Sequence, residues 1–325
     1  MAVMAEGGDT RTHAVAVGKA RSAAIQDRFF FYLTLGSAAF VVILLLGVMV
    51  SLLIGAWPAL STFGPAFIVT ERWSPVKEIF GALAPIYGTI ITSLIAMIIG
   101  IPVSFGIAIF LTEICPVPLR RPIGTAIELL AGIPSIIYGL WGFFFLAPFL
   151  QSTIQPFLIG TLGKVPLIGV LFGGAPYGIG LLTAGFILAI MVLPFITSIT
   201  RDVFQTVPVL LRESAYGMGM TTWEVVVSII IPYTRVGLVG GIMLGLGRAL
   251  GETMAVTFVI GNSHNISPSL LAPATTISST IANEFSEATG SLYTSSLIAL
   301  GLILFVITFA VLAAAKWMLG RAEVK

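Results

Sequence analysis

Residues 212–262 read RESAYGMGMTTWEVVVSIIIPYTRVGLVGGIMLGLGRALGETMAVTFVIGN. They divide into a polar loop and an apolar run. The loop begins near Glu213 and ends at Pro232, and its breaks and turns predict short helices outside a membrane. The apolar run that follows carries only three charges, and two of them, Arg248 and Glu252, lie deep inside it. This pattern predicts a membrane helix that contains buried charge.

The composition of the whole chain agrees with a membrane protein. Hydrophobic residues make up 57% of it and charged residues 9%, whereas a water-soluble domain carries about 25% charged residues. The net charge of +2 comes from a few basic residues in loops, so it does not indicate nucleic-acid binding. A single cysteine, Cys115, excludes an intrachain disulfide and a cysteine metal site.

Six apolar runs are long enough to span a bilayer, which needs roughly 20 residues for each crossing. We expect an all-α integral membrane protein with spans at approximately 29–55, 83–112, 123–150, 178–200, 233–262 and 291–319. Residues 1–28 are polar and rich in Ala and Gly, and they are expected to form a flexible cytoplasmic tail before a domain at 29–325.

The basic residues are distributed unequally between the two sides of these spans. One side carries Arg11, Lys19, Arg21, Arg28, Arg120, Arg121, Arg201, Arg212, Arg235, Lys316, Arg321 and Lys325. The other side carries only Arg72, Lys77 and Lys164. Because basic residues near spans stay cytoplasmic, this asymmetry predicts that both termini and the 201–232 loop lie inside the cell.

The buried charges of the fifth span need partners or a polar cavity. Arg248 is expected roughly 16 Å into a core about 30 Å thick, where a charge costs at least about 2.5 kcal/mol. Glu252 follows at the i, i+4 spacing, which predicts an ion pair on one helix face. Two interpretations stay open at this point: a pair that only offsets burial, or a cation that meets an anionic substrate.

Small residues recur along the same helix. Glycines at intervals of four allow close approach of a neighbouring helix, and we expect a packing role for Gly237, Gly241, Gly245, Gly247 and Gly251. No phosphate-binding sequence of the Gly-x4-Gly-Lys-Ser/Thr type occurs in the chain. ATP hydrolysis of that type would therefore take place on another polypeptide.

The polar loop resembles the EAA loop of the membrane subunits of ATP-binding-cassette importers. The matching positions, with Ser214 in place of the usual middle residue, are Glu213, Ala215, Gly219, Ile229, Ile231 and Pro232. The run GLGRALGETMAV at 245–256 is similar to phosphate-specific permeases of the PstC type, as are PSIIYG at 134–139, ESAYG at 213–217 and NEF at 283–285. The resemblance covers nearly the whole chain from Phe29 on.

This resemblance implies a type I importer (MetI-like) membrane domain that moves inorganic phosphate by alternating access across the bacterial inner (plasma) membrane. It implies that Arg248 and Glu252 lie on the substrate pathway and that the EAA positions contact an ATPase. The implied partners are a PstA-like second permease, a PstB-like ATPase dimer, a periplasmic or surface PstS-like phosphate-binding protein and membrane lipid. The chain itself would hold no cofactor or metal, because ATP and Mg²⁺ would be bound by the ATPase.

Three other functions would use parts of the same sequence. A membrane-embedded enzyme would need catalytic groups such as paired aspartates or a serine with a histidine base, and the two histidines, His13 and His264, lie in the tail and in a loop. A permease for another oxyanion fits the same residues. A non-transporting scaffold or sensor of phosphate status could use the loops, but it has no need for Arg248 at the midplane.

Overall fold

The computed structural model describes residues 7–166 and 168–323, which form helices and loops without β-strands. Among these residues, the helices long and apolar enough to cross a membrane are Gln26–Phe63, Leu83–Ile114, Ser135–Lys164, Leu181–Gln205, Thr222–Gly251 and Ser291–Trp317. The expected all-α fold with six candidate spans is thereby confirmed, although several bounds differ from the expected ones.

The chain divides into two compact units, one that ends at Ile54 and one that begins at Gly55. In the described part of the first unit the backbone belongs to the long helix α1 (Gly7–Phe63). Between Phe29 and Ile54 the apolar side chains of this helix are exposed on every face, and Phe30 and Ile43 keep 63% and 65% of their surface. A helix that is apolar on every face is stable in lipid or against another chain rather than in water.

The expected flexible tail at 1–28 is helical in its described part. Residues 7–28 form the beginning of α1, whereas residues 1–6 lie outside the described residues. The physical reason is local, because this segment contains no proline and several alanines and therefore has no signal that would stop a helix.

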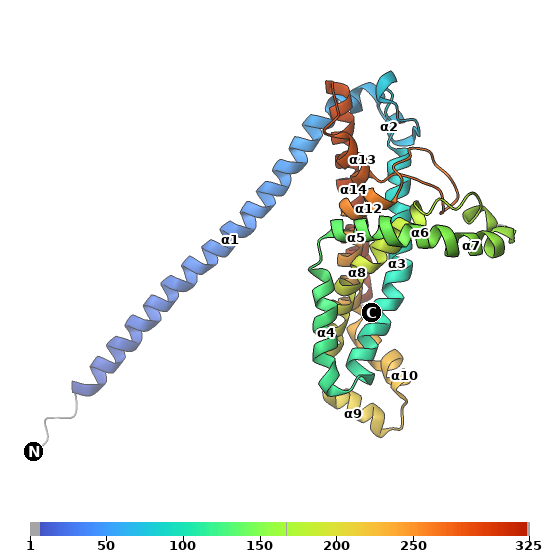
Figure 1. The fold of residues 1–325 in the computed structure, drawn as a ribbon. Coiled ribbons are helices and arrows are strands. Elements are labelled where there is room, and N and C mark those ends of the chain that lie inside the picture. Colours follow the sequence, from blue (N-terminus) through green and yellow to red (C-terminus); the bar gives the residue numbers. More distant parts are fainter. Residues whose placement is uncertain (1–6, 167, 324–325) are drawn as a thin grey trace, which may run out of the picture. The chain divides into compact units, whose positions relative to one another are not determined.

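The second unit is built around α3 (Leu83–Ile109) and α8 (Leu181–Gln205), which lie side by side (Figure 1). Small residues allow this contact: a Cβ atom built on Gly185 would lie 2.5 Å from Ile95. The helix α11 (Ile231–Gly251) packs on α8, and α14 (Ser291–Glu323) packs on α11. This arrangement places the middle of α11 against the centre of the unit.

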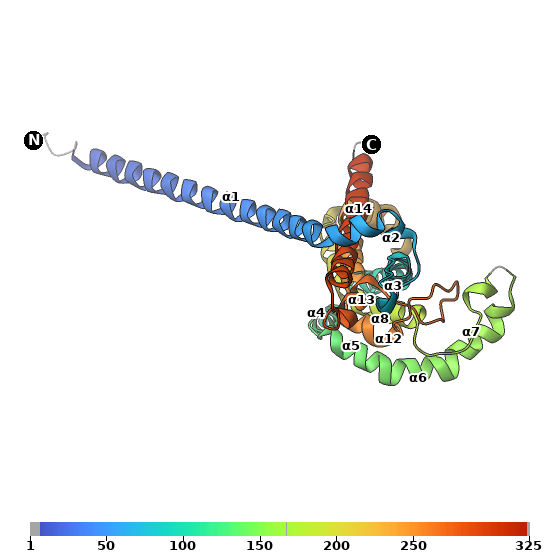
Figure 2. The same cartoon turned by 90° about the horizontal axis from the view of Figure 1, so that it is seen from above.

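The expected third span, 123–150, is interrupted. The helix α4 (Val117–Ala131) ends before Pro134, and the chain restarts as α5 (Ser135–Trp141), α6 (Ala147–Phe149) and α7 (Gln155–Thr161), joined by π-helical turns at 142–146 and 150–154. The residue before a proline disfavours helix, which explains the break. In Figure 2 the α5–α7 segment follows a curve, with α5 beside α12 and α7 farther from the other helices. The short 3-10 turns η5 (Leu162–Lys164) and η6 (Gly169–Leu171) follow it.

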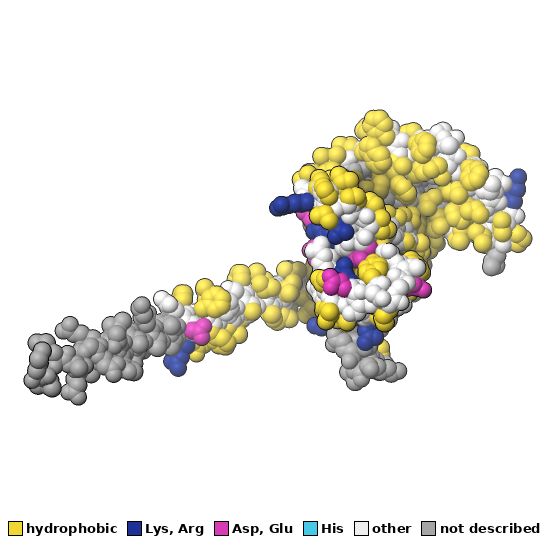
Figure 3. Space-filling view, turned by 90° about the horizontal axis from the view of Figure 1, so that it is seen from below, with side chains coloured by type: hydrophobic (Ala, Val, Ile, Leu, Met, Phe, Trp, Pro, Cys, Tyr) yellow, Lys and Arg dark blue, Asp and Glu magenta, His cyan; other side chains and the backbone are white. Residues whose placement is uncertain are grey.

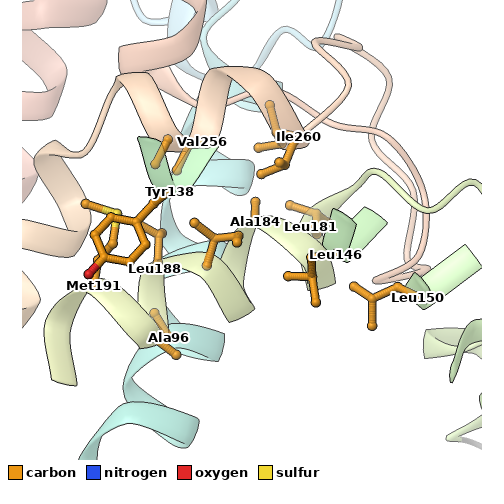
Figure 4. Packing of buried hydrophobic residues seen from close by; sticks show 14 of the residues in the cluster. Ala96, Tyr138, Leu146, Leu150, Leu181, Ala184, Leu188, Met191, Val256 and Ile260 are labelled. Carbon is orange, nitrogen blue, oxygen red and sulfur yellow. The ribbon is translucent and has the colours of Figure 1, made fainter. Parts of the chain in front are cut away.

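The expected fifth span, 233–262, is also interrupted. The helix α11 ends at Gly251, and the short helix α12 begins at Met254 and ends at Val259. The largest hydrophobic core lies beside this break, where α3, α5, α8 and α12 meet, and it includes Ala96, Tyr138, Leu188 and Val256 (Figure 4). The break therefore lies at the border of a packed region, since Gly251 and Met254 are themselves exposed.

A carboxylate holds the outer loops of the second unit together. These loops contain α2 (Ala66–Val69), η1 (Pro75–Lys77) and α13 (Ile277–Glu284). Glu284 accepts hydrogen bonds from Trp73 Nε1 at 2.6 Å and the Tyr293 hydroxyl at 2.7 Å, and His264 Nε2 lies 2.9 Å from it. The His264 ring also stacks on Trp73, with centroids 5.3 Å apart. Segments from three distant parts of the sequence are thereby joined at one side chain.

The same contacts decide the ionisation of Glu284. Burial by itself raises the pKa of this carboxyl, but the hydrogen bonds from His264, Tyr293 and Trp73 outweigh burial and the pKa is lowered. Because the folded-state pKa of Glu284 lies below the unfolded value, its stabilisation is complete above the unfolded value and is lost as the pH falls through the folded one.

We predict that Glu284→Gln lowers the free energy of unfolding by about 1–2 kcal/mol at neutral pH, since an amide cannot replace an ionised acceptor for three donors. Below the ordinary carboxyl pKa of 4.5 the wild type loses the same contribution, so the difference in Tm between the two proteins should shrink. Thermal unfolding of the purified protein from pH 3.5 to 7 measures this. The exposed Glu287→Gln is the matched control, and a difference that is constant with pH would contradict the prediction.

Candidate functional site at the break in the fifth span

Arg248 lies in the last turn of α11, next to the break, and its side chain is half-buried. Its guanidinium carbon is 4.4 Å from the ring centroid of Phe195 on α8. Its Nε is buried and has no hydrogen-bond partner among the described residues. A cation–π contact stabilises a desolvated cation by about 2 kcal/mol, but an aromatic face accepts no forked hydrogen bonds. The guanidinium therefore retains donors that suit an anion.

Glu252 does not pair with Arg248, so the expected i, i+4 ion pair is wrong in this structure. The residue is the C-cap of α11, with extended backbone at φ −70° and ψ 129°. Its Oε1 instead accepts a hydrogen bond from the backbone N–H of Ala255 at 3.4 Å. The i, i+4 geometry requires a continuous helix, and the helix ends at Gly251, one residue before the carboxylate.

Two aromatic residues near Arg248 were not identified from the sequence. Phe195 follows Pro194 in α8, and nothing in the sequence marks it as a contact of Arg248. Tyr138 lies close enough for the charge of Arg248 to act on its phenol, and its hydroxyl donates to the carbonyl of Leu130 at 2.9 Å. Tyr138 belongs to the PSIIYG run that carries part of the resemblance, but the run itself gives no role for the tyrosine.

The glycines of α11 fall into two groups. Gly237, Gly241 and Gly245 face Val203, Ile199 and Ile196 of α8, and a Cβ atom on any of the three would lie within 3 Å of these side chains. Gly247 and Gly251 have nothing within 4 Å of a built Cβ among the described residues. The close helix contact therefore uses the first three positions and stops before Arg248.

The polar loop at the other end of α11 forms two short helices around Gly219. They are α9 (Val209–Gly217) and α10 (Thr222–Val225), and a π-helical turn at 226–230 continues into α11. Gly219 has φ +84°, a conformation that side chains other than glycine rarely adopt, whereas the space around a built Cβ is empty. The requirement for glycine at this turn is therefore set by the backbone.

The residues that resemble an EAA loop lie on two sides of this structure. Ala215 is fully buried, and Ile229 and Ile231 pack against the same cluster. Glu213, Gly219 and Pro232 are exposed. Large apolar side chains are exposed next to them, with Leu210 at 74%, Met218 at 75% and Trp223 at 71%. An exposed apolar surface of this kind is typical of a site that binds another protein.

An ion pair fixes the loop to the second span. Arg212 on α9 donates to Glu113 Oε1 at 2.7 Å and to the carbonyl of Phe204. Glu113 lies in the π-helical turn that ends the second span, and its side chain is only 5% exposed. Arg212 therefore connects α9 to the ends of both the second span and α8.

No group of three or more His, Cys, Asp or Glu side chains that could hold a metal ion is present among the described residues. His264 and Glu284 belong to the outer loops, and Cys115 is buried as a free thiol. The candidate site is therefore limited to the break at Arg248 and the loop around Gly219.

Comparison with known proteins gives the same fold and a family. Residues 100–323 match the family described as "Binding-protein-dependent transport system inner membrane component". The chain is 66% identical to the phosphate transport system permease protein PstC of Mesorhizobium japonicum, over 94% of this chain and 93% of that protein. It is 59% identical to the protein of the same name from Pasteurella multocida, over 89% and 90%.

Solved structures agree at the level of the fold. A bacterial ABC transporter involved in import of the acidic polysaccharide alginate covers 93% of this chain, with a TM-score of 0.59 at 15% identity, and 99% of that chain is matched. The inward-facing MetNI methionine ABC transporter covers 77% of this chain and 99% of its own, with a TM-score of 0.54 at 15% identity.

We predict that Glu113→Gln destabilises the protein by about 3 kcal/mol, because it leaves the partly buried guanidinium of Arg212 without a countercharge. The double variant Glu113→Gln/Arg212→Gln should recover part of the loss. Thermal unfolding and limited trypsin cleavage near α9 measure the two effects, and the exposed Glu213→Gln is the control. Equal stability of Glu113→Gln and wild type would show that the ion pair does not fix the loop.

Proposed function

The chain belongs to the binding-protein-dependent transport system inner membrane components and, within them, to the PstC-type phosphate permeases, and on that premise we propose that phosphate crosses the membrane past Arg248. It is a multi-pass membrane protein and the permease subunit of a phosphate ABC importer.

The observation that carries the proposal is the state of Arg248. A half-buried guanidinium, held over Phe195 and with an unpartnered Nε, lies at the break of a discontinuous helix. In transporters, substrate sites are typically formed where such helices are interrupted near the midplane. A planar guanidinium binds phosphate through two parallel hydrogen bonds. Since no carboxylate pairs with Arg248 among the described residues, the cation is available to the anion without first being released.

Glu252 has a different role in this proposal from the one expected from the sequence. Its carboxylate accepts from the N-terminal backbone of α12, so it holds the two halves of the fifth span at the break. A negative charge near the pathway also opposes tight retention of phosphate, which favours release of the substrate after each cycle.

In this proposal, partner proteins supply the energy for transport. The exposed apolar side chains of α9 and α10 contact a PstB-like ATPase dimer, which binds ATP and Mg²⁺, and this chain holds no cofactor of its own. A PstA-like permease completes the pathway, and a PstS-like protein delivers phosphate at the opposite face. The rigid link from α9 through Arg212 to Glu113 supports this assignment, because it connects the ATPase contact to the spans.

We predict that Arg248→Gln lowers phosphate uptake at least about 10-fold, because the variant loses a charge-assisted forked donor. Arg248→Lys should restore part of the uptake. Transport into membrane vesicles, normalised to assembled complex, measures the effect, with the exposed Arg72→Gln as control. Competition by sulfate in the same vesicles tests the alternative that the chain is a permease for another oxyanion.

Glu252 provides the second half of this test. Because Glu252→Gln keeps an oxygen that can accept from Ala255, we expect a smaller loss than for Arg248→Gln. The double variant should be as inactive as Arg248→Gln alone. Recovery of uptake in the double variant would instead mean that the two residues only balance each other and that Arg248 does not meet the substrate.

We predict that Gly219→Val uncouples ATP hydrolysis from transport, since a β-branched residue is strained at φ +84° by roughly 1–3 kcal/mol. Gly217→Val is the matched control, because Gly217 also has open space for a Cβ but has no positive φ. Phosphate-stimulated ATPase activity of the reconstituted complex measures coupling. An unchanged activity in Gly219→Val would remove the turn from the coupling surface.

A further inference from the structure

A basic pocket lies at the end of the second unit that carries α9, and of its arginines the transport proposal uses only Arg212, in the link to Glu113. Its volume is about 560 Å³. It is formed where α4, the end of the second span, the end of α8 and α9 meet, and four guanidinium groups line it, from Arg120, Arg121, Arg201 and Arg212. Glu128 is the only carboxylate among the residues that line it in the described chain. Figure 3, which views the molecule from this end, shows basic and acidic side chains gathered on this face.

Two of the four arginines are neutralised by the protein. Arg201 forms ion pairs with Glu128 at 2.6 Å and with Asp202 at 3.1 Å. Arg212 pairs with Glu113 at 2.7 Å. Although Arg212 is paired, its Nε is buried and without a hydrogen-bond partner in the described part of the chain. These pairs account for the acidic residues near the pocket.

The other two arginines form no ion pair with a carboxylate in the described part of the chain. Arg120 donates through Nε to the carbonyl of Cys115 at 2.8 Å, and Arg121 is exposed. Neither forms an ion pair with any carboxylate in residues 26–317. Adjacent cations that face a shared pocket repel each other, and an anion between them removes this repulsion. The pocket therefore fits a ligand that carries negative charge.

The chemistry of the pocket selects the ligand. Guanidinium groups bind phosphate oxygens in pairs, and basic pockets between helices on the cytoplasmic side bind anionic lipid headgroups. On α4, Val117, Leu119 and Leu129 keep 75%, 50% and 69% of their surface, so acyl chains have an apolar surface beside the pocket. We propose that this pocket binds a phosphate group between Arg120, Arg121 and Arg212, carried by an anionic phospholipid or supplied as free phosphate. The bound group joins α4 to the α9 loop.

The test uses the full-length protein in its complex and the double variant Arg120→Gln/Arg121→Gln. In the lipid arm, retention of phosphatidylglycerol against phosphatidylcholine is measured by native mass spectrometry. In the phosphate arm, binding of inorganic phosphate is measured in an Arg248→Gln background, which removes the proposed pathway site. Arg72→Gln/Lys77→Gln, at the opposite end, is the matched control. The single variant Arg121→Gln removes no hydrogen bond or ion pair among the described residues, so it separates a loss of ligand binding from a loss of folding.

The expected result is a loss of affinity in one arm of roughly 5-fold for each arginine removed, with the control unchanged. A loss in the lipid arm identifies a headgroup, and a loss in the phosphate arm identifies the free ion. The proposal is overturned if the double variant binds both the lipid and the phosphate as tightly as the wild type does. This holds also if the variant only weakens association with a cytoplasmic protein. Transport by Arg72→Gln and Arg248→Gln is scored separately, so failure of the transport proposal stays distinguishable.

Discussion

A cation inside an apolar helix assembly is the constraint on which the rest of this structure depends. Arg248 is held by the face of Phe195 and not by a carboxylate among the described residues. This arrangement keeps the charge in place without cancelling it. It also requires the helix to end within one turn, because a continuous helix would bring Glu252 onto the same face and neutralise the guanidinium. The break at Glu252 and Thr253 is therefore part of the site.

The two ends of the second unit are fixed by charged contacts, whereas its middle is fixed by small residues. Glu284 joins the outer loops, and the ion pair of Arg212 with Glu113 joins the loop around Gly219 to the second span. Between them, Gly241 and Gly245 lie against the side chains of Ile199 and Ile196 on α8. Close packing through glycines is dry and carries no directional bonds. The middle of the assembly is therefore held by close packing, whereas its ends are held by directional contacts.

The sequence predicted the features that follow from hydropathy and spacing along one element. It predicted six candidate spans, and short helices on both sides of Gly219, because apolar runs and turn residues are local signals. It did not predict the break after Gly251, since no proline marks it, nor the contact of Arg248 with Phe195. The ion pair of Glu128 with Arg201 could not be predicted from the local sequence either, because the two residues lie 73 positions apart. Arrangements that join distant segments left no pattern in the sequence around each residue.

The contact between Gly88 and the outer loop can form only late in synthesis. A Cβ on Gly88 would lie 1.9 Å from the carbonyl oxygen of Thr275, so backbone meets backbone there. Beside it, the N–H of Ile277 donates to Thr89 Oγ1 across 188 positions of sequence. During synthesis α3 is inserted well before this loop has left the ribosome. The outer end of α3 must therefore wait in an incomplete state, and the last spans close the unit around a helix that entered the membrane near the beginning of translation.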